Sequence, residues 1–289
     1  MDDALLVLLL TAAACAPLGV FLILRRLSMM ADAISHTVLL GIVLAFFVTH
    51  DLGSPWLLFG AALMGVVTVS LVELLGKTRL VKYDDAIGVI FPLLFALAVI
   101  LISKYAGNAH LDTDMVLMGE VIYAGLNTVG IGGVEIPAAA LKMGGLALLI
   151  AVFITVFYKE LKVSAFDGEY ARLIGVPTGI LFYAFMSLTS LTTVAAFDAV
   201  GAILVISFFI APGAAALLFT KHLSHTLLLA LLVSMANSAL GYALAVHMNA
   251  SIAGLCAVIN MLVYLLALLM GPKGAVTTYI RRKRSMQQM

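Results

Sequence analysis

The sequence predicts an all-α polytopic membrane protein. Of its 289 residues, 64% are hydrophobic and 11% are charged, whereas a soluble domain averages about 45–50% apolar and about 25% charged residues. The hydrophobic residues gather in runs long enough to cross the roughly 30 Å core of a bilayer as helices. No stretch remains for a soluble domain, so we expect one integral domain over residues 1–289. The net charge of +1 gives no argument for a nucleic-acid partner.

Nine candidate spans follow one another along the chain. The one weak join is at Phe197-Asp198, where two apolar runs meet with almost no loop. Eight spans with one short or re-entrant segment is therefore the alternative. The candidate spans lie near 4–24, 27–48, 55–75, 85–103, 138–158, 179–198, 199–220, 225–246 and 251–271.

Lysine and arginine residues predict the orientation, because cytoplasmic loops carry an excess of them. If the acidic start, Asp2-Asp3, is placed outside, every Lys and Arg except Lys104 and Lys142 falls on the inner side. The N-terminus is therefore expected outside and the C-terminus inside. This orientation gives an extracytoplasmic segment at 104–137, a cytoplasmic loop at 159–178 and a basic cytoplasmic tail at 272–289.

Two ionisable residues inside the predicted second span are the strongest functional signal. Asp32 and His36 are four residues apart, so a helix places them on one face with Cβ atoms about 5–6 Å apart. His36 lies roughly 14 Å into the apolar run, near the middle of the bilayer core, where an aspartate costs at least about 2.5–3.5 kcal/mol. Imidazole nitrogen and carboxylate oxygen bind a divalent metal at about 2.0–2.2 Å. We therefore expect a metal site in a transport pathway; the alternative is an internal pair that only locks two helices.

Other polar residues in the spans are weaker candidates. Ser35 lies between the two predicted ligands, and Asp198 sits between two apolar runs, where we expect it to face an outer vestibule. Both are secondary candidates for the pathway. Glu73 lies near the inner end of the third span and is expected to pair there with Lys77.

Prolines inside three spans predict helix breaks, because proline leaves a carbonyl without its partner and bends a helix. Broken helices line substrate routes in many transporters, and an ordinary packing kink is an equal alternative. The residues concerned are Pro17, Pro92 and the pair Pro212-Gly213.

The outer segment contains the cluster His110, Asp112 and Asp114, which is a candidate for a weak outer metal site. The favoured alternative is a solvated loop in which Asp114 caps an amphipathic run over 115–126. Such a run would lie in the interface or cover the pore mouth.

The inner loop predicts a short helix capped by Asp167 and ended by Gly175 and Pro177. A short charged helix on the inner surface suits docking to a soluble partner, and a plain surface loop is the alternative.

Enzyme signatures are missing from the sequence. It contains neither G-x-x-x-x-G-K-[ST] nor H-E-x-x-H, so we expect no ATP site and no zinc protease activity. A membrane metalloenzyme is disfavoured, because two ligands on one helix lack a third with an evident general base. A proton-coupled secondary divalent-metal transporter remains the alternative to an ATP-driven importer, although it would have no need for an ATPase-docking helix.

Several stretches resemble the permease subunits of ATP-binding-cassette importers for manganese, iron and zinc. Three of them match the hallmark sequence of the family, its ATPase-coupling segment and its later signature: 30–36, 166–172, and 200–205 with 211–214. Three others look most like the second permease of systems that carry two different permeases: 110–114, 197–201 and 249–254. The sequence departs from the family at Gly168, where a proline is usual, and at Asn249, where an acid is usual.

The resemblance implies a type II ABC-importer-like permease in the bacterial cytoplasmic (inner) membrane. It implies four kinds of partner: an extracytoplasmic metal-binding protein, a second permease that is the same or a different chain, ATP-binding subunits on the cytoplasmic side, and the lipid bilayer. Asp32 and His36 match the residues thought to coordinate the passing Mn²⁺, Fe²⁺ or Zn²⁺, and these ligands alone do not select the metal. No tightly bound cofactor is expected. The residues matched to ATPase coupling are Phe166, Asp167, Glu169, Tyr170 and Arg172.

Overall fold

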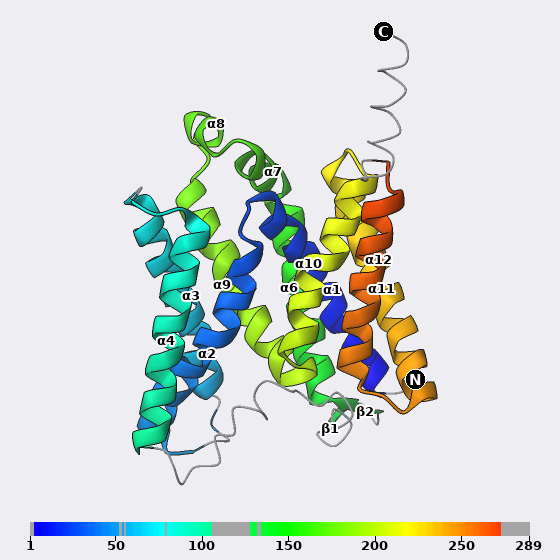
Figure 1. The fold of residues 1–289 in the computed structure, drawn as a ribbon, viewed down its shortest axis with the longest axis horizontal. Coiled ribbons are helices and arrows are strands. Elements are labelled where there is room, and N and C mark those ends of the chain that lie inside the picture. Colours follow the sequence, from blue (N-terminus) through cyan, green and yellow to red (C-terminus); the bar gives the residue numbers. More distant parts are fainter. Residues whose placement is uncertain are drawn as a thin grey trace. The chain divides into compact units, whose positions relative to one another are not determined.

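The computed structural model describes residues 3–51, 54, 56–78, 80–105, 128–131 and 134–272. Within these ranges, nine helices are long and apolar enough to cross a membrane, which confirms the predicted all-α polytopic class (Figure 1). They are α1 (Asp3–Leu24), α2 (Ser28–Thr49), α3 (Trp56–Lys77), α4 (Tyr83–Tyr105), α6 (Ala138–Val156), α9 (Thr178–Val200), α10 (Ala202–Phe219), α11 (Leu223–Met248) and α12 (Ile252–Met270).

The join between the sixth and seventh of these helices differs from the prediction by two residues. Helix α9 continues through Asp198 to Val200, and Gly201 forms the joint with φ +85° before α10 begins. Glycine adopts this conformation without the steric cost that a Cβ would bring. Both helices keep spanning length, so neither needs to be re-entrant.

Four short elements complete the described chain. The inner loop forms two helices, α7 (Tyr158–Phe166) and α8 (Gly168–Leu173), of which only the second was predicted. The outer segment ends in an antiparallel hairpin of β1 (Thr128–Ile131) and β2 (Val134–Pro137), which was not predicted. The His110, Asp112 and Asp114 cluster, the run over 115–126 and the tail beyond residue 272 lie outside the described residues.

The helices group into two compact units. The first contains Met1–Leu24, Val121–Ala147 and Ile203–Met289. In it α1 packs on α11, and α11 packs on α12. Gly19 of α1 lies so close to the Phe209 carbonyl of α10 that a Cβ would not fit there without a shift. Small residues are typical where membrane helices approach closely.

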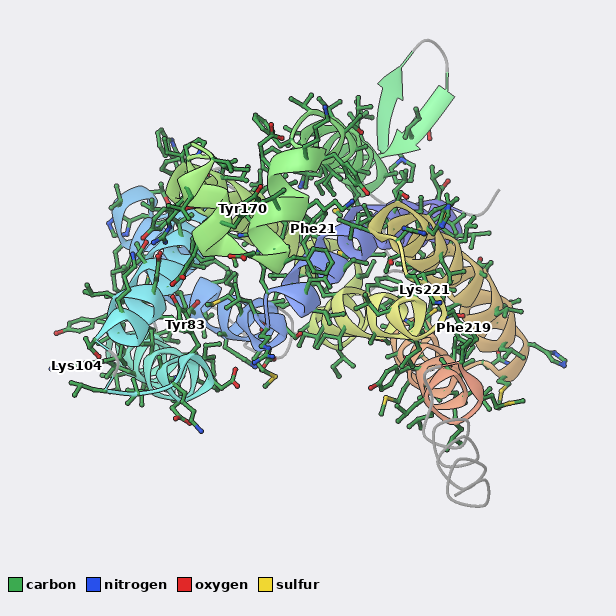
Figure 2. The ribbon with its side chains drawn as sticks, turned by 90° about the horizontal axis from the view of Figure 1, so that it is seen from above. Phe21, Tyr83, Lys104, Tyr170, Phe219 and Lys221 are labelled. Atoms are coloured by element: carbon green, nitrogen blue, oxygen red, sulfur yellow. The ribbon has the colours of Figure 1, made fainter. Side chains whose placement is uncertain are left out.

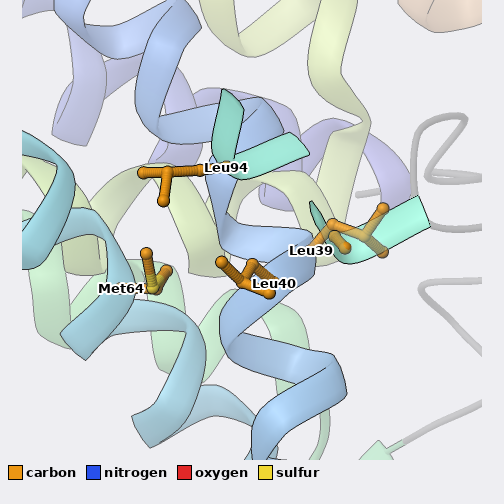
Figure 3. Close-up of a cluster of buried hydrophobic side chains, with 5 residues drawn as sticks. Leu39, Leu40, Met64 and Leu94 are labelled. Atoms are coloured by element: carbon orange, nitrogen blue, oxygen red, sulfur yellow. The ribbon is translucent and has the colours of Figure 1, made fainter. Parts of the chain in front are cut away.

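The second unit contains Arg25–Glu120 and Leu148–Ala202. Here α2 packs against α3, α4 and α9, and α3 also packs against α4 and α9. A cluster of buried apolar side chains joins α2, α3 and α4 (Figure 3): Leu39, Leu40, Met64, Leu94 and Ala98.

Polar contacts fix the helices of this unit in register. The Thr68 hydroxyl of α3 donates to the Thr37 hydroxyl of α2 at 2.7 Å. The Ser190 hydroxyl of α9 donates to the Ala62 carbonyl of α3 at 3.0 Å. Hydrogen bonds of this kind stabilise helix pairs in membranes by roughly 0.6 kcal/mol on average. The fold thus holds α2 between three neighbouring helices.

Candidate metal site

Helix α2 places the two predicted ligands side by side. It begins at Ser28 after a tight turn in which Arg26 has a positive φ of 59°. His36 Nε2 lies 3.5 Å from Asp32 Oδ1, and the two side chains keep 31% and 27% of their surface exposed. Their neighbours on the helix, including Ala33, Ile34 and Thr37, are buried. The pair therefore forms a partly exposed polar strip within the buried stretch 30–41 of α2.

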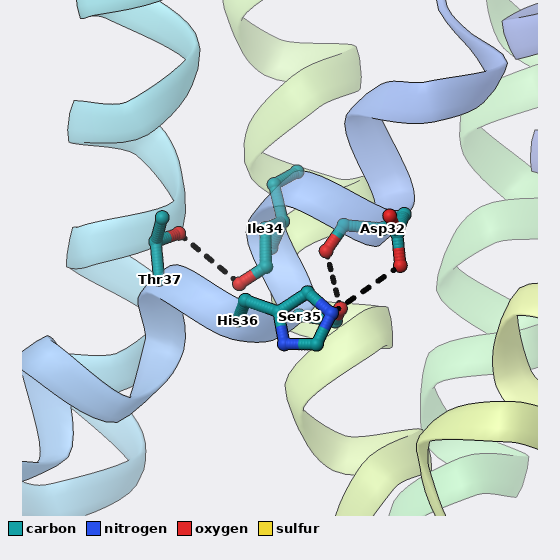
Figure 4. Close-up of polar contacts among 5 residues, drawn as sticks. All are labelled: Asp32, Ile34, Ser35, His36 and Thr37. Atoms are coloured by element: carbon teal, nitrogen blue, oxygen red, sulfur yellow. Dashed lines mark hydrogen bonds and ion pairs between the residues drawn. The ribbon is translucent and has the colours of Figure 1, made fainter. Parts of the chain in front are cut away.

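Hydrogen bonds within α2 stiffen the backbone around this pair (Figure 4). The Ser35 hydroxyl donates to the Asp32 carbonyl, and the Thr37 hydroxyl donates to the Ile34 carbonyl at 3.1 Å. Ser35 is itself buried, with 4% of its surface exposed. Its hydroxyl is directed at the helix backbone, which sets it apart from the two exposed ligands.

Two phenylalanines of α4 enclose the His36 ring. Phe91 stacks on it with a centroid distance of 5.6 Å, and Phe95 meets it edge-on at 5.7 Å. Aromatic pairs of this kind contribute about 0.5–1.5 kcal/mol beyond the area they bury. They hold the imidazole in the rotamer that directs Nε2 at Asp32. Sequence reasoning did not identify Phe91 and Phe95 as site residues. Their spacing of four shows only that they share one face of a helix, and nothing in the sequence shows that this face meets His36.

The pair has no third protein ligand within this chain as described. No group of three or more His, Cys, Asp or Glu side chains is close enough to hold a metal ion among the described residues. Asp198 is exposed near the end of α9 and so does not join Asp32 and His36 in such a group. A metal bound at this pair would need water or another chain to complete its shell.

The helix breaks predicted at prolines do not end any helix in the described structure. Helices α1, α4 and α10 each continue on both sides of Pro17, Pro92 and Pro212. Gly213 packs against Val20 and Ile23 of α1. This glycine therefore serves helix packing.

The inner loop has the predicted cap. The Asp167 side chain accepts a hydrogen bond from the Tyr170 backbone N–H at 2.9 Å, and Gly175 ends the segment with φ +86°. Gly168 begins α8, and a Cβ there would meet nothing within 4 Å. The first helical position also suits proline, so glycine and proline are both compatible with this cap.

The residues matched to ATPase coupling are displayed on the surface of α7 and α8 (Figure 2 labels Tyr170). Phe166 and Tyr170 keep 66% and 54% of their surface exposed. Asp167, Glu169 and Arg172 are exposed as well. Exposed aromatic residues beside charges are typical of a surface that binds another protein.

Two other sequence features have a structural reason. Glu73 pairs with Lys77 at 2.7 Å, as predicted. Asn249 ends α11 in the left-handed conformation with φ +50°, which asparagine tolerates better than most residues. Its departure from the acid usual in the family therefore preserves the helix end.

The fold and site define a multi-pass membrane protein with a partly exposed Asp–His pair on one of its spanning helices. Comparison with known proteins identifies the class more closely: residues 1–271 match the ABC 3 transport family, and the chain belongs to that family. The predicted resemblance is confirmed.

Two relatives and one solved structure cover most of the chain. It is 44% identical to the manganese transport system membrane protein MntD of Bacillus subtilis, over 96% of this chain and 95% of the relative. It is 44% identical to the zinc transport system membrane protein TroD of Treponema pallidum, over 95% of this chain and 75% of the relative. PsaBC of Streptococcus pneumoniae, solved in complex with Fab, matches with a TM-score of 0.78 and 27% identity over 97% of this chain and 94% of that chain.

These findings place the chain among the multi-pass permeases of the bacterial inner membrane. They favour an ATP-driven importer over the alternative of a self-sufficient proton-coupled carrier, because the matched family is one of ABC transport.

Proposed function

We propose that this chain is the membrane subunit of an ATP-driven importer that moves Mn²⁺, Fe²⁺ or Zn²⁺ into the cytoplasm. The ion passes along the face of α2 that carries Asp32 and His36, in a pathway between this chain and a second permease. The N-terminus faces outside and the C-terminus inside. The partly exposed Asp32–His36 pair within a buried stretch of α2 is the observation that carries this proposal.

The small number of ligands in the Asp32–His36 pair suits a transport site, which must release its ion, better than a storage site. An imidazole and a carboxylate are ligands that Mn²⁺, Fe²⁺ and Zn²⁺ all accept. Two ligands on one chain leave the shell incomplete, so the ion can leave again. A second permease that brings an equivalent pair would raise the number of protein ligands to four. The partial exposure of both side chains and the lack of a third candidate ligand among the described residues support this arrangement.

The chain has a route by which an ATPase could act on the pair. Helix α8, capped by Asp167, and the exposed Phe166 and Tyr170 form the proposed docking surface for the ATP-binding subunits. Helix α7 precedes α8 in the chain, and its Ser164 hydroxyl accepts a hydrogen bond from the Arg25 guanidinium. Arg25 lies seven residues before Asp32 in the sequence. A movement of α7 on ATP binding would therefore be transmitted to the start of α2.

The proton chemistry of the site follows from its residues. A metal ion binds neutral imidazole and carboxylate, so the ion competes with protons for both groups. Uptake is expected to weaken in acid, because protons then compete with the ion for its ligands.

The remaining partners follow from the proposed orientation. An extracytoplasmic metal-binding protein would dock on the side of the 104–137 segment and deliver the ion. Hydrolysis of ATP would take place in the separate cytoplasmic subunits. Asp198 and Ser35 stay proposals as secondary positions along the pathway.

Metal uptake by membrane vesicles that carry the full complex tests the proposal. We expect Asp32→Ala and His36→Ala to abolish uptake of one of the three metals while the complex still assembles and hydrolyses ATP. His225→Ala is the matched control, because this exposed histidine also stands between a serine and a threonine. Uptake that survives both changes at the pair would refute its role, and wild-type vesicles that import none of the metals would refute the function.

A further inference from the structure

Arg25, at the turn between α1 and α2, is partly buried and makes no ion pair with an acid among the described residues. Its Nη2 donates to Ser164 Oγ of α7 at 2.8 Å, and its guanidinium lies 5.4 Å from the ring centre of Phe185. Its Nε is buried and has no hydrogen-bond partner. Within the described ranges, neither Asp32–His36 nor Glu73–Lys77 involves Arg25, and no Asp or Glu is found at salt-bridge distance from it.

The charge of Arg25 persists in this setting. Burial lowers the pKa of its guanidinium to about 10, so it stays protonated at neutral pH. A charge taken out of water without a partner is costly, and the usual remedy is an anion within hydrogen-bond distance. Arg25 therefore lacks a negatively charged partner among the described residues, and a bound anion would supply one.

A cavity of about 480 Å³ opens at this arginine. Its wall includes the cations Arg25, Arg26 and Lys82 and the polar residues Tyr83 and Ser164 (Figure 2 labels Tyr83), and Asp84 is the one acid among the described residues that line it. Three cations against one acid leave this part of the wall with a net positive charge. The guanidinium and ammonium groups supply hydrogen-bond donors but no acceptors.

The position of the cavity at the ends of membrane helices favours a phosphate group as the bound anion. Its residues come from the α1–α2 turn, the start of α4, α7 and the first turns of α9, which are all ends of membrane-spanning helices or a helix outside them. This is the side that we propose to be cytoplasmic. Basic pockets between membrane helices on that side are suited to the phosphate of lipid head groups. Guanidinium groups match phosphate oxygens with paired hydrogen bonds.

We propose that this cavity, the Arg25 pocket, binds a phosphate group, supplied by an anionic phospholipid head group or by free phosphate. Such a phosphate would bridge the α1–α2 turn and α7. The Arg25 pocket does not depend on which metal is transported, because neither Asp32 nor His36 lines it.

Lipid retention by the intact complex tests this proposal. The complex is purified, stripped of lipid with detergent, mixed with phosphatidylglycerol or phosphatidylcholine, and examined by native mass spectrometry. We expect wild type to retain phosphatidylglycerol at least fivefold more than Arg25→Gln and Lys82→Gln, with no difference for phosphatidylcholine. Lys221→Gln, which removes an exposed cation outside the pocket, should behave as wild type (Figure 2).

A second arm identifies the source of the phosphate. If millimolar inorganic phosphate displaces phosphatidylglycerol from wild type, or binds with the same dependence on Lys82, the pocket accepts free phosphate as well as the lipid. Lys82 is exposed, so Lys82→Gln decides the question if Arg25→Gln fails to assemble. Equal retention of phosphatidylglycerol by wild type and Lys82→Gln, with no effect of phosphate, would overturn the proposal.

Discussion

Removing the aromatic ring that stacks on His36 should weaken metal affinity without stopping transport. In Phe91→Leu the position stays apolar, but the imidazole loses the contact at 5.6 Å and keeps only the edge contact with Phe95 at 5.7 Å. The lost aromatic contact costs about 0.5–1.5 kcal/mol. Freedom among three side-chain rotamers adds at most about 0.6 kcal/mol. The sum of about 0.5–2 kcal/mol corresponds to roughly twofold to thirtyfold weaker binding.

The assay is metal uptake by proteoliposomes that contain the full complex, with the metal concentration varied. The apparent KM should rise by this factor, while the maximal rate and the ATPase activity stay near wild type. Phe153→Leu is the matched control, because Phe153 also pairs with an aromatic ring, that of Phe157 at 5.2 Å, and neither residue touches the candidate ligands. An unchanged KM in Phe91→Leu, Phe95→Leu and the double variant would refute the idea that α4 holds His36 in position.

Two further predictions concern helix packing and helix capping. Gly19→Ala should lower the melting temperature of the complex, because overpacking at the Phe209 carbonyl costs about 1–3 kcal/mol. Gly88→Ala is the control and should not lower the melting temperature, because a Cβ at Gly88 meets nothing within 4 Å. Equal melting curves for the two variants would contradict the close approach at Gly19. Asp167→Ala removes the cap on the Tyr170 N–H and destabilises α8 by about 0.5–2 kcal/mol. The complex should still assemble, but the amount of metal imported per ATP hydrolysed should fall. An unchanged ratio of metal imported to ATP hydrolysed would count against α8 as the coupling helix.

The class of the protein could be predicted from sequence because it rests on long-range composition. Runs of apolar residues of spanning length can form only helices in a bilayer, so hydropathy identifies them one by one. The pair Asp32–His36 was recognisable because two ionisable groups at helical spacing inside such a run are costly. Its 3.5 Å contact agrees with that spacing.

Features set by local geometry were harder to predict. The end of α9 depends on the positive φ of Gly201, and the neighbouring Asp198 suggested an earlier boundary. Helix α7 is short and carries charged and apolar residues in one turn, so it looked like part of a loop. The β1–β2 hairpin had a usable signal, since Gly132-Gly133 separates two short runs with β-branched residues.

The surroundings of the site could not be read from the sequence at all. Which side of α4 faces α2 depends on how the helices rotate as they pack, and hydropathy does not encode this. Phe91 and Phe95 therefore looked like any other residues of an apolar span. Arg25 looked like an ordinary cation of an inner loop, whereas the structure buries it against Ser164 and Phe185.

Direct metal binding by the purified complex tests the central claim most closely. The imported metal is added to wild type, Asp32→Ala and His36→Ala, and both its stoichiometry and its X-ray absorption spectrum are recorded. The account predicts a bound ion with imidazole and carboxylate ligands in wild type, loss of the imidazole signal in His36→Ala, and weaker binding in Asp32→Ala. A spectrum and stoichiometry that are the same in all three proteins would contradict it, because the ion would then be held elsewhere.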